Sequence, residues 1–196
     1  MFYTSIYHSP LGTLYFNVEN NALTALWFEG QKYAPDLSSE HILIDSLSHE
    51  SGIASLSQEH FPSRIHSLSQ SHVLSSETDK VITLTRTWLD LYFSGSQPDF
   101  LPPMHPKGTA FREAVWKLLL NIPYGQTRTY GQLAAELAVL QGKKKMSAQA
   151  VGGAVGHNPI SVIIPCHRVL GSDGSLTGYA AGVSVKEALL RLEGVF

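Results

Sequence analysis

The start of the chain consists of short runs of apolar, aromatic and β-branched residues separated by polar turn residues, a pattern typical of β-structure. The segments 2–7, 14–18 and 23–28 are rich in β-branched and aromatic residues, and turn residues at 9–12 and 19–21 separate them. This spacing predicts a three-strand antiparallel meander.

The pattern changes between residues 36 and 76. This stretch holds 13 serines and 5 of the 9 histidines, and its apolar residues are scattered. We expect a long irregular insertion that is partly helical at best. Its histidines match no metal-ligand spacing, and no cysteine lies among them, so they predict a solvated polar segment rather than a metal site. They are His41, His49, His60, His66 and His72.

An apolar stripe with helical spacing follows. From Glu77 to Phe93, apolar residues recur every three or four positions and predict a helix. The stripe consists of Val81, Leu84, Thr85, Trp88, Leu91 and Tyr92. Prolines at 98, 102, 103 and 106 then indicate a stiff linker. We therefore expect an N-terminal α/β domain at 1–104, with a small sheet and a helix, and a C-terminal domain at 105–196.

The C-terminal half reads as a series of short helices. Thr109 can cap a helix that runs to Leu120, and Thr129 with Gln132 forms a capping-box pattern for a helix to about residue 140. Ser147 can cap a third helix over residues 148–156. The last two helices, joined by a turn, predict a helix-turn-helix in a mainly α domain.

The third of these helices carries almost no side chains. Each interior glycine costs about 0.5–1 kcal/mol relative to alanine, so the small residues need a reason. Either this helix packs tightly against another helix, or its backbone approaches a ligand. The small residues are Ala148, Ala150, Gly152, Gly153, Ala154 and Gly156.

Charge separates the two halves. Residues 1–104 carry 4 Lys and Arg against 11 Asp and Glu, whereas residues 105–196 carry 10 against 5. The net charges are therefore −7 and +5, and the basic half could meet phosphates even though the whole chain is at −2. The N-terminus lacks the features of a signal peptide, and no apolar run is long enough to span a bilayer. With a single cysteine, these features predict a cytoplasmic protein without a disulfide.

That cysteine, Cys166, lies in the run Ile-Ile-Pro-Cys-His-Arg-Val at 163–169. A thiol is nucleophilic only as the thiolate, and a neighbouring base or cation increases the thiolate fraction. His167 and Arg168 follow it directly. The apolar residues 161–164 predict a buried strand that presents the thiol. The alternative is a free cysteine packed as a small apolar residue.

The run 165–169 resembles the Pro-Cys-His-Arg-Val signature of the O6-alkylguanine-DNA alkyltransferases, also called methylated-DNA–protein-cysteine methyltransferases. The resemblance covers almost half of the chain and comprises several separate motifs in order. They lie at 108–111, 122–125, 129–134, 150–154, 158–159, 177–182, 186–190 and 192–194.

The resemblance implies roles for the residues around the thiol. Cys166 would be the nucleophile and alkyl acceptor, and His167 its base, acting directly or through a water. Glu193 would fix the imidazole tautomer, and Asn158 would brace the turn and hydrogen-bond near the cysteine. Such a relay predicts a Cys166 pKa below about 8.5, the value of a free thiol.

The resemblance also implies substrate contacts. Tyr130 would lie beside the DNA backbone and help to rotate the nucleotide, and Tyr179 would belong to the loop that closes the pocket. The N–H of Ala180 would face the guanine O6, while the carbonyls of Cys166 and Val169 would accept from the exocyclic amine. The target base must be flipped out of the duplex to reach this pocket.

For DNA, the resemblance places the small-residue helix in the minor groove. Family members commonly carry an arginine before the Ala-Val-Gly motif, where it fills the space of the flipped base; here the residue is Gln149. Glutamine can insert but brings no charge. Lys143–Lys145 is either a phosphate contact or a solvated turn. The expected DNA contacts are Gln149, Ala150, Gly152, Gly153 and Arg168.

The implied fold has a ribonuclease H-like N-terminal domain and a helix-turn-helix domain. The implied function is direct repair of O6-alkylguanine, and to a lesser degree O4-alkylthymine, in double-stranded DNA by a monomer without metal or cofactor. Some relatives hold a zinc through N-terminal cysteines, which this chain lacks. The alternatives are a non-catalytic damage-binding protein, which Cys166 argues against, a cysteine hydrolase, and a transcription regulator.

Overall fold

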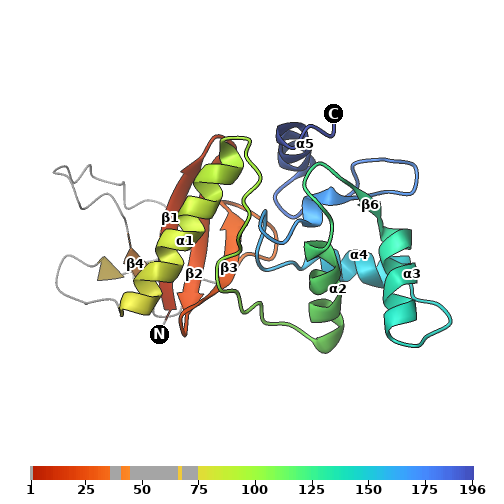
Figure 1. Cartoon of the computed structure of the whole chain (residues 1–196), viewed down its shortest axis with the longest axis horizontal. Coiled ribbons are helices and arrows are strands. Elements are labelled where there is room, and N and C mark those ends of the chain that lie inside the picture. The colour runs from red at the N-terminus through yellow and green to blue at the C-terminus, as the bar shows by residue number, and fades with distance from the viewer. Residues whose placement is uncertain (1, 36–40, 45–65, 68–74) are drawn as a thin grey trace.

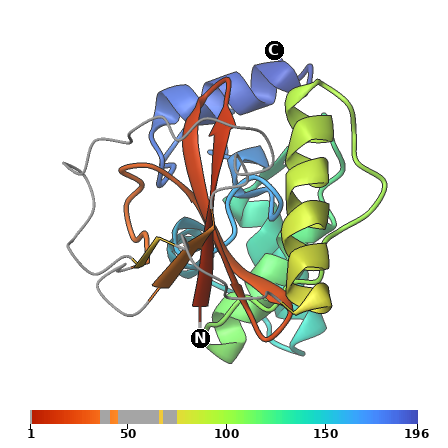
Figure 2. The same ribbon diagram turned by 90° about the vertical axis from the view of Figure 1, so that its left-hand side faces the viewer.

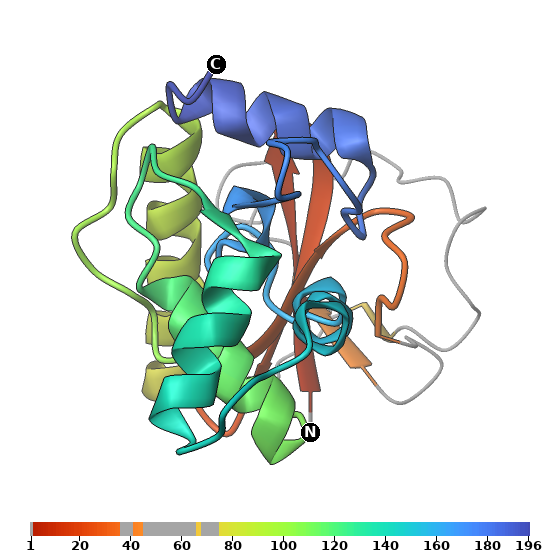
Figure 3. The same cartoon turned by 90° about the vertical axis from the view of Figure 1, so that its right-hand side faces the viewer.

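A computed structural model describes residues 2–35, 41–44, 66–67 and 75–196 of the chain. A twisted sheet and one long helix form the N-terminal half, and four shorter helices gather beside the sheet in the C-terminal half (Figure 1). The C-terminal helix runs across the top of the molecule in Figures 2 and 3.

The sheet begins with the predicted meander, which is confirmed. β1 (Phe2–Ser9), β2 (Gly12–Glu19) and β3 (Ala22–Phe28) pair antiparallel in sequence order. The sheet continues on the other side of β1 with β4 (His41–Ile44) and β5 (His66–Ser67), both parallel to their neighbours, in the order β3-β2-β1-β4-β5.

The expectation of an irregular, partly helical insertion at 36–76 is therefore wrong for β4 and β5. Their runs of four and two residues are too short for periodicity to reveal. Residues 36–40, 45–65 and 68–74 lie outside the described part of the chain. Within the described ranges, no group of three or more His, Cys, Asp or Glu residues is arranged to hold a metal ion.

The long helix α1 (Ser76–Phe93) packs beside the sheet (Figure 2). Ser75 caps it by accepting a hydrogen bond from the Thr78 N–H. The buried face differs by a small rotation from the predicted stripe, because Leu84 and Leu91 are exposed whereas Ile82 and Leu89 are buried. The remaining members of the stripe are buried as predicted: Val81, Thr85, Trp88 and Tyr92.

The predicted caps of the next three helices are confirmed. Thr109 caps α2 (Ala110–Leu120), the Thr129–Gln132 capping box opens α3 (Tyr130–Leu140), and Ser147 caps α4 (Ala148–Gly156). Figure 3 shows these helices below the C-terminal helix α5 (Val183–Leu192). A short parallel pair, β6 (Arg128–Thr129) and β7 (Val169–Leu170), ties the start of α3 to the segment after Cys166.

One continuous cluster of buried apolar residues runs through both halves. Trp116 of α2 donates its indole N–H to the carbonyl of Ala154 in α4 at 2.9 Å. Gly108 lies against the same ring, where an added Cβ would come within 2.5 Å of the indole, so only glycine fits. The isolated bridges Leu23–Met104 and Leu26–Ile160 join β3 to the C-terminal half. This shared core holds the sheet against the segment that leads to Cys166.

The predicted strand at 161–164 is wrong. These residues form buried turns, and Val162 has a φ of +68°. Proline stands on both sides of this short apolar run, and periodicity cannot distinguish a buried strand from another buried segment of this length. The turn is fixed by backbone bonds from Ser161 N to Leu26 O and from Ile164 N to Ile160 O. No helix in the described ranges has the length and apolar content required to cross a membrane.

Candidate active site

Cys166 is presented by a single 3₁₀ turn, Cys166–Arg168, that begins after Pro165. The residue is 7% exposed and borders a cavity of about 10 Å³. Such a volume holds about one water molecule. The cavity walls come from the end of α4, the turns at 158–161 and the loop before α5. The lining residues are Val155, Gly156, Asn158, Ser161, Cys166, Gly178, Tyr179 and Ala180.

Asn158 braces this turn with nearly its full hydrogen-bonding capacity. Its Nδ2 donates to the carbonyls of Ile164 and Ile160 at 2.8 and 3.1 Å, and its Oδ1 accepts from the Ile160 N–H at 3.1 Å. The same Nδ2 lies 3.1 Å from the Cys166 Sγ. The amide therefore fixes both the turn and the position of the sulfur.

Burial raises the pKa of the Cys166 thiol above its ordinary value. The hydrogen bond from Asn158 and the charge of Lys186 act in the opposite direction but do not outweigh the loss of hydration. The predicted lowering of this pKa is therefore wrong for the resting protein. Sequence proximity suggested an activated thiol, whereas enclosure keeps it protonated.

Glu193, the residue just after α5, collects hydrogen bonds from four residues. Burial opposes its ionisation, but the hydrogen bonds that His167 and Arg168 donate, together with the positive charge of Arg168, outweigh this and lower its pKa to about 2. The donors lie 2.7–3.1 Å away: His167 Nε2, Tyr92 OH, Arg168 Nε and Nη2, and the Gly125 N–H. Glu193 is thus an ionised carboxylate in a dry site.

His167 is fully buried, and its Nε2 lies 2.7 Å from Glu193 Oε1. Its Nδ1 has no hydrogen-bond partner among the described residues. Burial lowers the pKa of His167, although Glu193 favours the charged form, so the ring is neutral. The carboxylate selects the tautomer with the proton on Nε2, which leaves Nδ1 as an unoccupied acceptor.

Tyr92 is a site residue that the sequence did not reveal as one. It belongs to the apolar stripe of α1, and its hydroxyl donates to Glu193 at 2.7 Å and lies 3.3 Å from His167 Nε2. Nothing in a helical stripe distinguishes a core tyrosine from one that bonds a distant carboxylate. The N-terminal half therefore contributes directly to the relay.

Arg168 differs from its expected role. Its side chain is buried, and its guanidinium engages Glu193 through Nε and Nη2 and the Ile122 carbonyl through Nη1 at 2.6 Å. It also lies over the ring of Tyr124 at 5.7 Å. A guanidinium held in this way cannot reach a DNA phosphate, which argues against the predicted DNA contact.

Two of the four expected substrate residues line the pocket, and the other two are hydrogen-bonded to Thr177 or Lys186. Tyr179 and Ala180 line it, and Tyr130 at the start of α3 donates its hydroxyl to the Thr177 carbonyl at 3.3 Å. The Val169 carbonyl accepts from Lys186 Nζ at 2.5 Å, and Lys186 also donates to Thr177 O at 2.9 Å. Lys186 is fully buried and was not singled out by sequence. A lysine in the stripe of an amphipathic helix gives no such signal.

The glycines of α4 differ in how much space lies beside them. A Cβ on Gly152 would make ordinary contact with the Tyr130 ring at 3.6 Å. A Cβ on Gly153 or Gly156 would meet nothing within 4 Å. Tight helix packing therefore does not explain the last two glycines. Gln149, Ala150 and Gly153 lie on the exposed side of the helix, where a ligand could approach the backbone.

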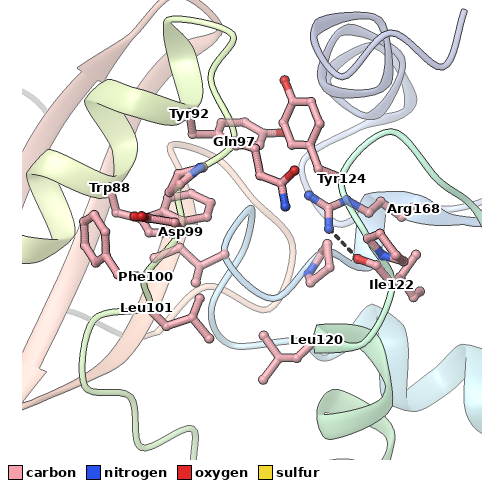
Figure 4. A pocket seen from close by; sticks show the side chains of 14 residues that line it. Trp88, Tyr92, Gln97, Asp99, Phe100, Leu101, Leu120, Ile122, Tyr124 and Arg168 are labelled. Atoms are coloured by element: carbon pink, nitrogen blue, oxygen red, sulfur yellow. Dashed lines mark hydrogen bonds between the residues drawn. The ribbon is translucent and has the colours of Figure 1, made fainter.

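A larger cavity of about 490 Å³ lies between the end of α1, the linker and the turn at 120–124 (Figure 4). Arg168 stands at its edge with its bond to Ile122, and Tyr92 forms another part of the wall. Cys166 is not among its lining residues. By volume alone this larger cavity would be taken as the active site, but the Cys166 thiol borders the smaller cavity.

Comparison with known proteins supplies an independent view. A family model described as "6-O-methylguanine DNA methyltransferase, DNA binding domain" matches residues 110–195. A methylated-DNA–protein-cysteine methyltransferase of Haemophilus influenzae is 34% identical, over 98% of this chain and 87% of that protein. Its counterpart in Mycobacterium tuberculosis strain H37Rv is 43% identical, over 70% and 76%.

Two further matches bear on extent and shape. A Methanosarcina barkeri methyltransferase of the same name is 51% identical, but the match covers only 54% of this chain and 63% of that protein. The crystal structure of Mycobacterium tuberculosis OGT in complex with DNA superposes with a TM-score of 0.72 at 32% identity. That superposition covers 98% of this chain and 93% of the other. Both halves of the chain therefore share the arrangement of that protein.

Proposed function

This chain belongs to the methylated-DNA–protein-cysteine methyltransferase family and acts in direct-reversal DNA repair, and we propose that Cys166 is its alkyl acceptor. The observation that carries this assignment is the pairing of the only cysteine with a buried His167–Glu193 hydrogen bond of 2.7 Å. Residues of the relay come from α1, the 3₁₀ turn and the end of α5. The substrates are O6-alkylguanine and, to a lesser degree, O4-alkylthymine.

The reaction begins with loss of the thiol proton. His167 Nδ1 accepts it, directly or through a water, while Nε2–H stays bonded to Glu193, which stabilises the imidazolium. The thiolate sulfur attacks the alkyl carbon, the S–C bond forms, and the C–O6 bond breaks with its electron pair going to guanine. The released guanine then takes up a proton. The thioether is a poor leaving group, so the protein is consumed.

Activation therefore accompanies substrate binding. A thiol with a raised pKa is a weak nucleophile at rest, but a neutral His167 is a competent base. Asn158 keeps the sulfur in place during transfer, and its N–H supports the developing negative charge. Tyr130, Val169, Tyr179 and Ala180 would hold the base in the roles expected from the sequence.

DNA binding is assigned to α4 and its surroundings. Exposed Gln149, Ala150 and Gly153 and the open space at the glycines support a close approach of the helix backbone to the minor groove. In this assignment α3 and α4 act as a helix-turn-helix. The exposed Lys143–Lys145 run would contact phosphates.

Three finer parts of the proposal rest on the sequence and the family. The N-terminal half, in which α1 packs on the strands, would be a ribonuclease H-like domain with its boundary near residue 105. The protein would act as a cytoplasmic monomer and would need no metal or cofactor.

Intact mass spectrometry tests the function. Incubation with duplex DNA containing one O6-methylguanine should add one methyl group per protein and then stop, and Cys166→Ala should take none. A second methyl group, or continued demethylation beyond one equivalent, would contradict the suicide mechanism. Binding without any mass change would favour a damage-binding protein instead.

A further inference from the structure

The pocket beside Cys166 is closed in this structure. Its volume of about 10 Å³ contrasts with the roughly 300–1,000 Å³ of ordinary ligand sites. A flipped base cannot enter until one wall moves away. The contacts that hold the walls together therefore control access to the thiol.

The wall formed by Tyr179 and Ala180 is held by a small number of hydrogen bonds. It lies between Gly178 and Gly182, whose φ values of +45° and +98° favour glycine. Before this segment, Lys186 and Tyr130 hold the carbonyl of Thr177. Within the segment, the Ala180 carbonyl accepts from the Lys32 N–H at 2.9 Å, and Lys32 belongs to the other half of the chain.

Lys32 lies in the loop of residues 29–34 that follows β3, which we call the 29–34 loop. Gln31 anchors this loop, because its buried Oε1 accepts from Phe28 N at 3.2 Å and from Ser161 Oγ at 2.9 Å. Ser161 lines the same pocket. The 29–34 loop thus contacts two walls of the pocket, one through Gln31 and one through Lys32.

The tip of the 29–34 loop reaches α4. Tyr33 stacks on His157, the C-cap of α4, with ring centroids 4.2 Å apart and an angle of 20° between the planes. Tyr33 is 56% exposed and has a φ of +63°, an unfavourable conformation for a tyrosine. Such strain persists only where neighbouring contacts compensate for it. The ring of Tyr33 has two such contacts, the stack on His157 and the Lys32 ammonium 4.8 Å from its centroid.

We propose that the 29–34 loop is a latch on the pocket, and that its bond to Ala180 and its stack on His157 must release before the alkylated base enters. The proposal rests on the proposed function, which assigns DNA to α4 and the base to this pocket. Contact of α4 with DNA would disturb the His157 end, so release of the latch couples DNA binding to exposure of the thiol. Lys32 and Tyr33 act here as positioning residues.

Reactivity of Cys166 with iodoacetamide, without DNA, measures opening of the pocket. Lys32→Pro removes the N–H that Ala180 accepts, whereas Lys32→Ala keeps it. Tyr33→Leu removes the stack, whereas Tyr33→Phe keeps it. Lys32→Pro and Tyr33→Leu should each raise the alkylation rate about two- to tenfold, the range expected for losing one weak contact. Tyr33→Phe should react like wild type. Lys32→Ala loses only the ammonium over the Tyr33 ring and should therefore react well below the rate of Lys32→Pro.

Thermal melting and a second reagent separate the possible failures. If Lys32→Pro and Tyr33→Leu leave the iodoacetamide rate unchanged, or if Lys32→Ala and Tyr33→Phe accelerate it equally, the latch is wrong. It is also wrong if the acceleration merely follows a fall in melting temperature. The free base O6-benzylguanine should react faster with the two latch variants in the same ratio. If the thiol becomes accessible but no protein, wild type included, accepts the benzyl group, the proposed function fails while the latch stands.

Discussion

Glu193→Gln should destabilise the protein by an amount that can be calculated from the pKa shift of the Glu193 carboxylate. The carboxylate is fully buried, and its pKa falls from an ordinary value of 4.5 to about 2. Each pKa unit corresponds to about 1.4 kcal/mol, so ionised Glu193 contributes about 3 kcal/mol at neutral pH. Removing one partner of a buried pair costs about 3–5 kcal/mol by independent reasoning, because Arg168 is left uncompensated.

The pH dependence follows from the sign of this shift. A lowered folded-state pKa gives stability that is fully present above pH 4.5 and is lost as the pH falls through 4.5 toward 2. Urea unfolding should therefore show a gap of about 3 kcal/mol between wild type and Glu193→Gln at pH 7. The gap should narrow by about 1.4 kcal/mol per pH unit below 4.5.

Glu187→Gln, in the helix α5 that ends just before Glu193, is the matched control. Glu187 pairs with Arg191 at 2.7 Å, but both side chains are exposed, so its loss should cost no more than about 0.5 kcal/mol. Equal losses for Glu187→Gln and Glu193→Gln would refute the reasoning. So would a gap for Glu193→Gln that stays constant from pH 7 to 3, because the carboxylate would then not be the titrating group.

Two further predictions concern the thiol and the DNA helix. Alkylation of Cys166 by iodoacetamide should rise with a pH midpoint above that of a free thiol, because burial raises the pKa of Cys166. Asn158→Ala should move this midpoint higher because the sulfur loses its N–H donor, and an unchanged midpoint would remove Asn158 from thiol chemistry. Gln149→Ala should slow repair of alkylated duplex DNA but spare reaction with free O6-benzylguanine. Gln149→Arg should steepen the slope of log binding constant against log salt concentration by up to about one. Duplex repair untouched by Gln149→Ala would mean that another residue holds the duplex open.

The sequence predicted those features that local chemistry dictates. The helix starts at Thr109, Thr129 and Ser147 follow from side-chain caps that satisfy free N–H groups, and all three caps formed. The meander of β1 to β3 follows from aromatic and β-branched runs separated by turn residues. The short strand β4 pairs with distant β1, and β5 pairs in turn with β4, so no local pattern encodes either strand.

The site was predicted by motif and not by geometry. Cys166, Asn158, His167 and Glu193 come together as the resemblance implied. Tyr92 joins them from α1, although it lies 75 residues before His167 along the chain. Its role depends on packing between the halves, and a stripe residue carries no sign of it.

Arg168 and Lys186 show how burial alters the meaning of a charge. A cation beside a cysteine suggests a lowered thiol pKa, but the guanidinium of Arg168 is paired with the carboxylate of Glu193. Lys186 is the buried cation that acts on the sulfur, and burial lowers its own pKa to about 8. A rising pH would therefore weaken this cation while it favours the thiolate, and the two titrations are coupled. In the proposed mechanism, His167 would take the thiol proton once substrate is bound at neutral pH, where Lys186 is still charged.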